Sequence, residues 1–283
     1  MKKSKIIVPA LGILVLSTAA AVTGTVAWFT SNNTLSVTGM QAKVDAENGI
    51  VVSNEAKSVW ATSAVAQHSG EDQSFLLTST ADLAAWYHNK SDNANDHTAA
   101  EDYTTLTVTK PAAGTQTTNT GIGTATYNQQ TKNVYLINRF YIQSASGLEL
   151  TGQDLKVKNI AATGASGSAE LDKALRVAFK SAQTSVIYAP FAGASLSYNV
   201  AGAATATTIV DGSLGEGEGA TGDTRTLLSN VTIPTFIQSG NTALEIEVYV
   251  FFEGEDPAAK SANITANLDD LTVSFEFENA IHA

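Results

Sequence analysis

Along most of the chain, apolar and polar residues alternate with a period of two, which is typical of β-strands that bury one face. The last such segment, DLTVSFEFE, shows the pattern most clearly, and its apolar residues are expected to face a core. This inward set is Leu271, Val273, Phe275 and Phe277. The segment 244–252 has the same alternation, with five apolar residues on one face, and is also predicted to be a strand.

The other predicted strands are short, apart from residues 134–144. They lie at 75–77, 106–108, 155–160, 176–179, 186–188, 195–200, 207–210 and 228–233. Helical spacing occurs as a single turn at 82–86 and again at 168–175, where Ser168 is a suitable N-cap. Many short strands with little helix predict an all-β fold, a jelly-roll-like or Greek-key β-sandwich with long loops and one or two short helices.

Two features near the N-terminus concern how the first strands connect. Leu35 and Val37 alternate in one phase, and the apolar residues at 40–44 alternate in the other, so a β-bulge at Thr38-Gly39 would realign the two faces. Asn48-Gly49 then separates this segment from the apolar stretch 50–52. An Asn-Gly pair between two strand patterns predicts a β-hairpin.

The first 29 residues have a different pattern. Three lysines precede the apolar run 6–16, and small residues follow as far as Ala27, so a signal peptidase is expected to cut before Trp28. The alternative is a membrane-spanning helix over 6–29, which is uncharged and long enough to cross a bilayer. However, its second half inserts weakly, and no basic cluster follows it. We therefore expect a signal peptide at 1–27, a single β-sandwich domain with loop insertions at 28–283, and a secreted protein at the cell surface or in the extracellular matrix.

Composition and charge exclude several classes of partner and chemistry. The chain has no cysteine, so it has neither disulfides nor thiolate metal ligands. Its formal charge is −11; without the three leader lysines, 13 basic residues remain against 27 acidic ones, or −14. Such an acidic chain is not expected to bind nucleic acid or an anionic membrane surface. Contact with a membrane is expected only transiently, through the leader.

Candidate chemistry is sparse. The four histidines lack the spacing of a metal motif, and no GxSxG segment is present. Glu253, Glu255 and Asp256 are the best candidates for cation ligands, but a charged turn at the end of a strand explains them more simply. Trp60 and Trp86 either form a sugar-binding platform or lie in the core. We therefore predict no catalytic residue, no metal site and no cofactor.

The stretch TVAWFTSNNTLSVTGMQAKV resembles the leader junction of the TasA/camelysin family, which comprises secreted matrix proteins of Gram-positive bacteria. In that family a SipW-type peptidase cuts after Thr-x-Ala and before an aromatic residue. The matching residues here are Thr25, Ala27, Trp28, Phe29 and Thr30. The segments VYVFFEGEDP and LTVSFEF also resemble related secreted proteins. The resemblance covers the leader, about the first twenty mature residues by inspection, and the last two strands.

This resemblance implies a jelly-roll-like sandwich, extracellular fibres and a role in a biofilm matrix. It also implies that the mature N-terminal segment is donated as a strand to the next subunit, which makes the chain its own main partner, with other matrix proteins as further candidates. Camelysin is described as a metallopeptidase, but no motif for that activity maps onto this chain.

Three hypotheses for the function follow. The first is a structural subunit of an extracellular fibre, assembled by donor-strand exchange; the second is a camelysin-like metallopeptidase, and the third is a monomeric glycan-binding adhesin. In the first, Trp28, Phe29, Leu35 and Val37 would fill pockets of the neighbouring subunit. Its alternative is that residues 35–44 pair within their own subunit while the preceding residues fray.

Overall fold

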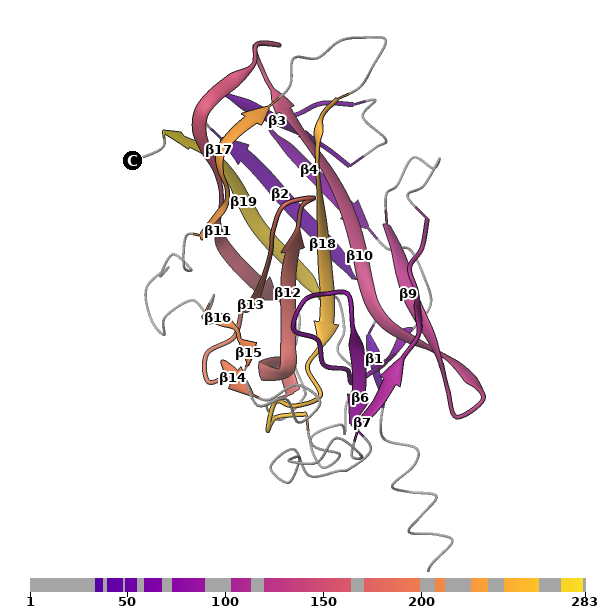
Figure 1. The fold of residues 1–283 in the computed structure, drawn as a ribbon. Helices are drawn as coiled ribbons and strands as arrows, with labels where there is room; N and C mark the ends of the chain where they lie inside the picture. Colours follow the sequence, from indigo (N-terminus) through magenta and orange to yellow (C-terminus); the bar gives the residue numbers. More distant parts are fainter. Residues whose placement is uncertain are drawn as a thin grey trace, which may run out of the picture.

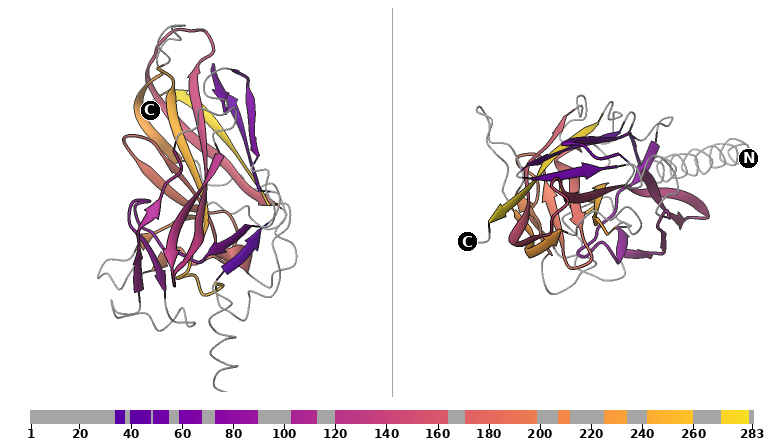
Figure 2. Two further views of the ribbon diagram at one scale, coloured as in Figure 1. Left: turned by 90° about the vertical axis from the view of Figure 1, so that its right-hand side faces the viewer. Right: turned by 90° about the horizontal axis from the view of Figure 1, so that it is seen from above.

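The computed structural model describes residues 34–37, 40–47, 49–54, 59–67, 73–89, 103–112, 120–163, 171–198, 207–211, 225–233, 242–259 and 271–281. These residues lie almost entirely in strands (Figure 1), so the predicted all-β fold class is confirmed. Two large sheets lie face to face, as the views in Figure 2 show, and form a sandwich.

The larger sheet has ten strands, centred on a long antiparallel pair. Its main path runs through β1 (Thr34–Val37), β5 (Gln73–Leu76), β10 (Gln130–Ser144), β18 (Leu244–Phe252), β12 (Leu175–Lys180), β13 (Ser185–Ala189) and β16 (Val210–Asp211). Three further strands branch from this path: β3 (Ile50–Ser53) and β9 (Thr120–Tyr127) pair with β10, and β8 (Val108–Thr109) pairs with β9. The central pair, β10 and β18, holds the sheet together.

The smaller sheet has five strands. Their order is β17 (Arg225–Ile233), β11 (Leu150–Thr163), β19 (Thr272–Ile281), β2 (Gln41–Glu47) and β4 (Ser63–Gln67). β19 and β2 pair in parallel, and the other neighbours are antiparallel. Two small two-stranded sheets complete the described strands: β6 (Trp86–Asn89) with β7 (Tyr103–Leu106), and β14 (Ser197–Tyr198) with β15 (Thr207–Thr208).

The main core lies between the two large sheets. The inward face predicted for the last strand is confirmed, because Leu271, Val273, Phe275 and Phe277 are all buried. Phe275 contacts Phe140, Phe179 and Phe277, with ring centroids 5.7, 4.9 and 5.3 Å apart. Such tilted aromatic contacts add to the stabilisation that burial itself provides.

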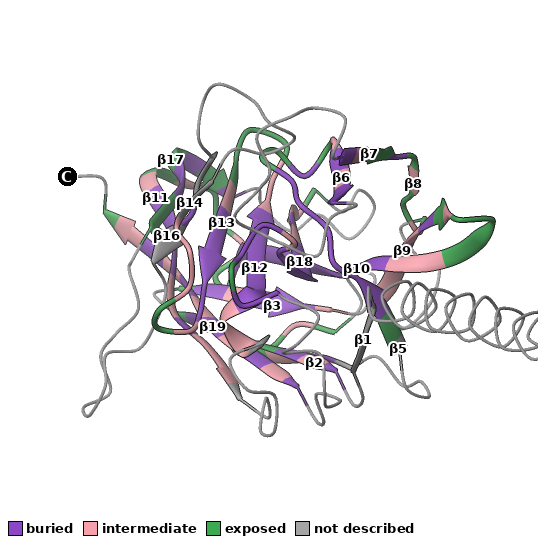
Figure 3. Cartoon of the chain, turned by 90° about the horizontal axis from the view of Figure 1, so that it is seen from below, coloured by how far each residue is buried: buried purple, intermediate pink, exposed green. Residues whose placement is uncertain are grey.

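A second core lies on the opposite face of the larger sheet. Trp86 of the β6–β7 hairpin packs against Tyr135 and Phe251, with ring centroids 4.8 and 5.1 Å apart. Figure 3 accordingly shows β12 and β18 in purple over much of their length, because these central strands are covered on both faces. Trp86 is therefore a core residue and does not form a sugar platform.

The two predicted helical segments have different outcomes. A 3₁₀ helix, η2 (Leu171–Ala174), followed directly by β12, confirms the order of a short helix and then a strand. The helical turn predicted at 82–86 is wrong. Residues 81–85 form bends in which the Asp82 carboxylate accepts the N–H groups of Ala84 and Ala85, and Leu83 has a left-handed φ of 59°. An Asx-type turn thus replaces the helix there.

The predicted β-hairpin at Asn48-Gly49 is also wrong. β2 belongs to the smaller sheet and β3 to the larger one, so the turn carries the chain from one layer to the other. Gly49 has a φ of +81°, a conformation that glycine adopts without strain. The strands around Thr38-Gly39 are likewise in different sheets, since β1 pairs with β5. The two phases of alternation therefore do not belong to one bulged strand.

Candidate functional site

The N-terminal strand lies at the edge of the larger sheet. β1 pairs only with β5 among the described strands, antiparallel, with Leu35 opposite Phe75 and Val37 opposite Gln73. β5 joins the rest of the sheet through one backbone register pair with β10 and through its buried residues Phe75 and Leu76. Within this chain, then, residues 34–37 pair with their own subunit. The other predicted assembly residues, Trp28 and Phe29, lie outside the described residues together with Ala27.

The smaller sheet ends at β17, whose outer edge has no strand partner in the described part of the chain. A short edge of the larger sheet is open nearby. Residues 244–246 of β18 pair with β10 on one side, but β12 ends at Lys180 opposite Glu247, so no described strand pairs with their other side. One backbone edge from each sheet thus lacks a partner among the described strands at the same side of the sandwich.

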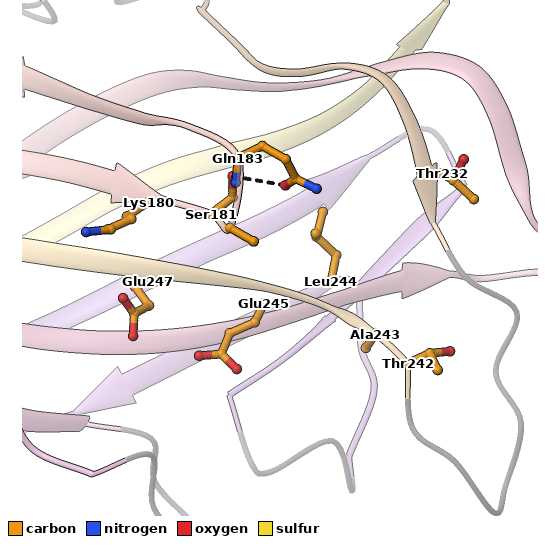
Figure 4. A pocket seen from close by; sticks show the side chains of 10 residues that line it. Lys180, Ser181, Gln183, Thr232, Thr242, Ala243, Leu244, Glu245 and Glu247 are labelled. Carbon is orange, nitrogen blue, oxygen red and sulfur yellow. Dashed lines mark hydrogen bonds between the residues drawn. The ribbon is translucent and has the colours of Figure 1, made fainter.

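Two neighbouring hollows lie between these edges and the β12–β13 turn, one of about 500 Å³ and one of about 570 Å³. They share Gln183, Thr232 and Leu244. The first is shown in Figure 4, and its lining residues are Lys180, Ser181, Ala182, Gln183, Thr232, Thr242, Ala243, Leu244, Glu245 and Glu247. The second follows β17 from Thr226 to Thr232. We call the two hollows together the edge groove.

Charge in the edge groove is unevenly balanced. The Glu247 carboxylate lies 2.6 Å from Lys110 Nζ and 3.3 Å from Arg139 Nε. Burial alone would raise the pKa of Glu247, but hydrogen bonds from Lys110 and Tyr249 and the charges of Lys110 and Arg139 outweigh it and hold this pKa below its ordinary value. Glu245 is more exposed, at 42% of its side chain, and lies 3.8 Å from Arg139 Nε. Glu245 is therefore the more accessible acid of the groove.

The predicted cation candidates lie at the other end of β18, in a buried turn. Glu253 is fully buried and accepts hydrogen bonds from Ser79 Oγ and from the backbone N–H of Glu255. Glu255 accepts from Asn89 Nδ2 at 2.9 Å and from Tyr103 Oη at 3.0 Å, so it joins both strands of the β6–β7 hairpin. Burial and the nearby charge of Glu253 raise the pKa of Glu255 to about 7, although both hydrogen bonds oppose the shift.

The third acid, Asp256, forms a buried ion pair. Its Oδ2 accepts Arg176 Nη2 at 2.7 Å and the backbone N–H of Ser195 at 2.8 Å, and its Oδ1 accepts the N–H of Ala258 at 2.9 Å. Arg176 is fully buried and also donates to the carbonyls of Lys173, Leu175 and Ser195. This pair fixes η2 and the segment before β14 to the acidic turn.

The three carboxylates bind three different sets of donors and do not converge on one point. Within the described residues there is no group of three or more acids or histidines that could hold a metal ion. Ser79 and Glu253 are both buried, so neither offers a nucleophile or a base to a substrate. The acidic turn is a structural centre that fastens the second core to the end of β18.

The aromatic and histidine candidates that the structure describes do not form a binding site. His88 is buried, and its Nδ1 lies 2.8 Å from the carbonyl of Leu77. Burial lowers the pKa of His88, against the opposing hydrogen bond, which keeps the ring neutral. Trp60 is half-buried. His68, His97 and His282 lie outside the described residues.

Comparison with protein-family models, with curated proteins and with solved structures found no match. No helix in the described ranges is long and apolar enough to span a membrane.

Sequence reasoning placed the acidic turn correctly at the end of a strand but missed its burial and the edge groove. The signal for burial was present in part: Asp256 and Arg176 are a matched pair, but they lie 80 residues apart. The groove exists because β12 ends opposite Glu247 of β18. The register between these two strands cannot be predicted from a sequence pattern.

Proposed function

We propose that the protein is a secreted structural subunit of an extracellular fibre or biofilm matrix, and that it polymerises through its N-terminal strand. The observation that carries this proposal is the position of β1, a four-residue edge strand with a single described partner. It begins six residues after the expected cleavage point before Trp28. Processing would therefore leave an arm of six residues directly in front of an edge strand.

Edge strands offer unpaired backbone groups to other chains. An arm that leaves its own subunit and pairs with the next satisfies those groups by β-augmentation. Because the donor and the acceptor are different surfaces, the contact is heterologous, and repetition gives an open filament wherever the rotation does not close a ring. The uncharged side chains from Trp28 to Ala42 support this proposal, since after cleavage the arm would carry no charge other than its terminal ammonium group.

The test is electron microscopy of the processed protein at raised concentration. Deleting Trp28 to Asn33 is expected to abolish filaments while leaving a folded monomer, as judged by an unchanged far-UV circular dichroism spectrum and thermal unfolding midpoint. A second variant replaces the same six residues with Gly and Ser, which keeps the length of the arm but removes its aromatic side chains. Normal filaments from the deletion variant would overturn the proposal.

The two alternative functions give different results with the same preparation. Proteolysis of casein that a chelator stops would indicate a metallopeptidase. Saturable glycan binding by a protein that stays monomeric would indicate an adhesin. Neither result is expected, because the candidate acids bind protein donors and Trp86 is buried.

A further inference from the structure

The edge groove has the features of a receptor for an extended polypeptide. Along its length run the nine residues of β17, which lack an outer partner in the described ranges. The strand is bulged and Asn230 has a φ of 51°, so it spans at most about 30 Å. Opposite them, residues 244–246 of β18 have no described strand on the side where β12 ends. A strand placed between these edges would find backbone donors and acceptors to pair with.

The composition of the groove suits an uncharged, mixed polar and apolar segment. Leu227, Leu228 and Val231 are buried along β17, whereas Thr226, Ser229 and Thr232 are exposed. Each hollow is within the volume range of sites that hold drug-sized ligands, so each can take an aromatic ring.

The groove has one acid that an incoming positive charge can reach. Lys180, Glu245 and Glu247 line the groove, and Lys110 and Arg139 lie against the two acids. Glu247 is already close to Lys110 and Arg139, and Glu245 is the exposed member. A segment with a single positive charge at one end can place that charge beside the exposed carboxylate of Glu245.

The segment 28–33 of this chain, WFTSNN, fits these requirements. It has two aromatic residues followed by four polar ones, and its only charge after cleavage is the new α-ammonium group of Trp28. Six extended residues span about 20 Å, which is shorter than β17. Figure 1 shows β1, which follows this segment, at the lower right of the molecule and β17 at the upper left. β1 and β17 thus lie on opposite sides of the subunit.

We propose that the edge groove binds residues 28–33 of a second copy, with the Trp28 ammonium group beside Glu245. This inference rests on the proposed function, because it identifies the surface that receives the donated arm. It also links assembly to processing: the ammonium group exists only after the leader has been removed. The competing acceptor is β5 of the neighbouring subunit, which would reproduce in trans the pairing of β1 within the chain.

Cysteine pairs separate these acceptors cleanly because the chain has no native cysteine. Processed S31C protein is mixed with processed S229C protein under assembling, mildly oxidising conditions, and cross-linked dimers are counted by gel electrophoresis. The matched controls are S36C mixed with S74C, which are opposite each other in the β1–β5 register, and S31C mixed with S63C on β4, the other edge of the smaller sheet. We expect dimers from the first mixture and background levels from both controls.

The outcomes distinguish the inference from the proposed function. Filaments with cross-links from S36C and S74C would leave the fibre proposal standing and overturn the groove, as would filaments with cross-links from S31C and S63C. Absence of both filaments and cross-links would overturn both proposals.

A charge variant tests the ammonium contact separately. E245Q should raise the critical concentration for filament formation by about two- to fivefold, the range of an exposed ion pair. E149Q, at an exposed position in the β10–β11 turn, should leave it unchanged. Equal critical concentrations for E245Q and the unsubstituted protein would rule out Glu245 as the partner of the amine.

Discussion

The two cores of this protein are held together by different chemistry. The main core, between the sheets, is almost wholly apolar, and both polar side-chain atoms of Asn138 within it lack a hydrogen-bond partner in the described structure. The second core, on the outer face of the larger sheet, is fastened at one end by Glu253, Glu255 and Asp256. Apolar packing tolerates modest changes of shape, whereas buried charges depend on every partner.

This difference explains which part of the molecule resists substitution and which part responds to pH. The main core contains no acid and no histidine, so its stability should change little with pH between 4 and 8. The acidic turn places two carboxylates near each other in a buried site, and the pKa of one of them is raised to about 7. The second core should therefore loosen under conditions that leave the main core intact.

The largest effect is expected from breaking the Arg176–Asp256 pair. Arg176→Met removes the buried guanidinium and leaves Asp256 as an uncompensated charge, which should lower the free energy of unfolding by about 3–5 kcal/mol. Urea denaturation of the processed protein measures this change. Ile246→Val in the main core is the matched control and should cost about 0.5–1.5 kcal/mol.

The contrast between the two cores would be wrong if Arg176→Met lowered the free energy of unfolding by no more than Ile246→Val does. A double variant with Asp256→Leu sharpens the test. It should be less destabilised than the sum of the two single variants, because no buried charge is left without a partner.

A smaller effect is expected from Glu255, and it depends on pH. Its folded pKa of about 7 lies above the ordinary value of 4.5, so between these values the folded state binds more protons than the unfolded state. Stability should therefore fall as pH rises from 4.5 to 7, by at most about 3 kcal/mol from this group. Glu255→Gln should remove this slope and stabilise the protein at pH 8.

Denaturation of the wild type and the variant at matched pH values checks this prediction, and contributions from other groups cancel in the difference. Glu149→Gln, in an exposed turn, is the control and should keep the slope of the wild type. A constant difference between wild type and Glu255→Gln from pH 4.5 to 8 would contradict the raised pKa.

The smallest effect is expected from Asn138. Both polar atoms of its side chain are buried without a hydrogen-bond partner in the described structure, between Leu136 and Phe140 on the same face of β10. Asn138→Val should raise the free energy of unfolding by about 1–2 kcal/mol, since it removes an unpaired amide from an apolar environment. The reverse change nearby, Leu136→Asn, should destabilise the protein. Loss of stability in Asn138→Val would instead indicate a polar partner for the amide.

The sequence was informative where one face of a strand meets the main core. The alternation ending at Phe277 predicted its four buried residues correctly, because a period of two places alternate side chains on the same face. That of β18 predicted four of five, since Leu244 is half-buried, and it missed Tyr249 and Phe251, which are buried on the other face. The sequence pattern gave a wrong prediction at the point where the chain crosses from one sheet to the other. Gly49 resembles a hairpin turn, since local turn chemistry is the same whether the next strand pairs with the last one or crosses to another sheet.

The acidic turn shows a second limit. EGEDP predicts an exposed charged turn, because runs of acids are usually solvated. Here its acids are buried, since Asn89, Tyr103 and Arg176 reach them from distant parts of the chain. Partners so far apart in the chain leave no periodic pattern in the sequence. Neither the burial of the three acids nor the raised pKa of Glu255 could therefore be predicted from it. The edge groove depends in the same way on strand register.

The parallel pairing of β2 with β19 has a consequence for when the protein can fold. Seven residue pairs join residues 41–47 to residues 272–278, and Gln41 bonds to Thr272 across 231 positions of the chain. Contacts between the two ends of a chain form slowly, because a long loop must close before they contribute. The smaller sheet stays incomplete until the last strand has been synthesised. If the protein is exported as proposed, this delay would keep the chain unfolded, and so able to pass through a membrane channel, until residues 272–281 have been synthesised.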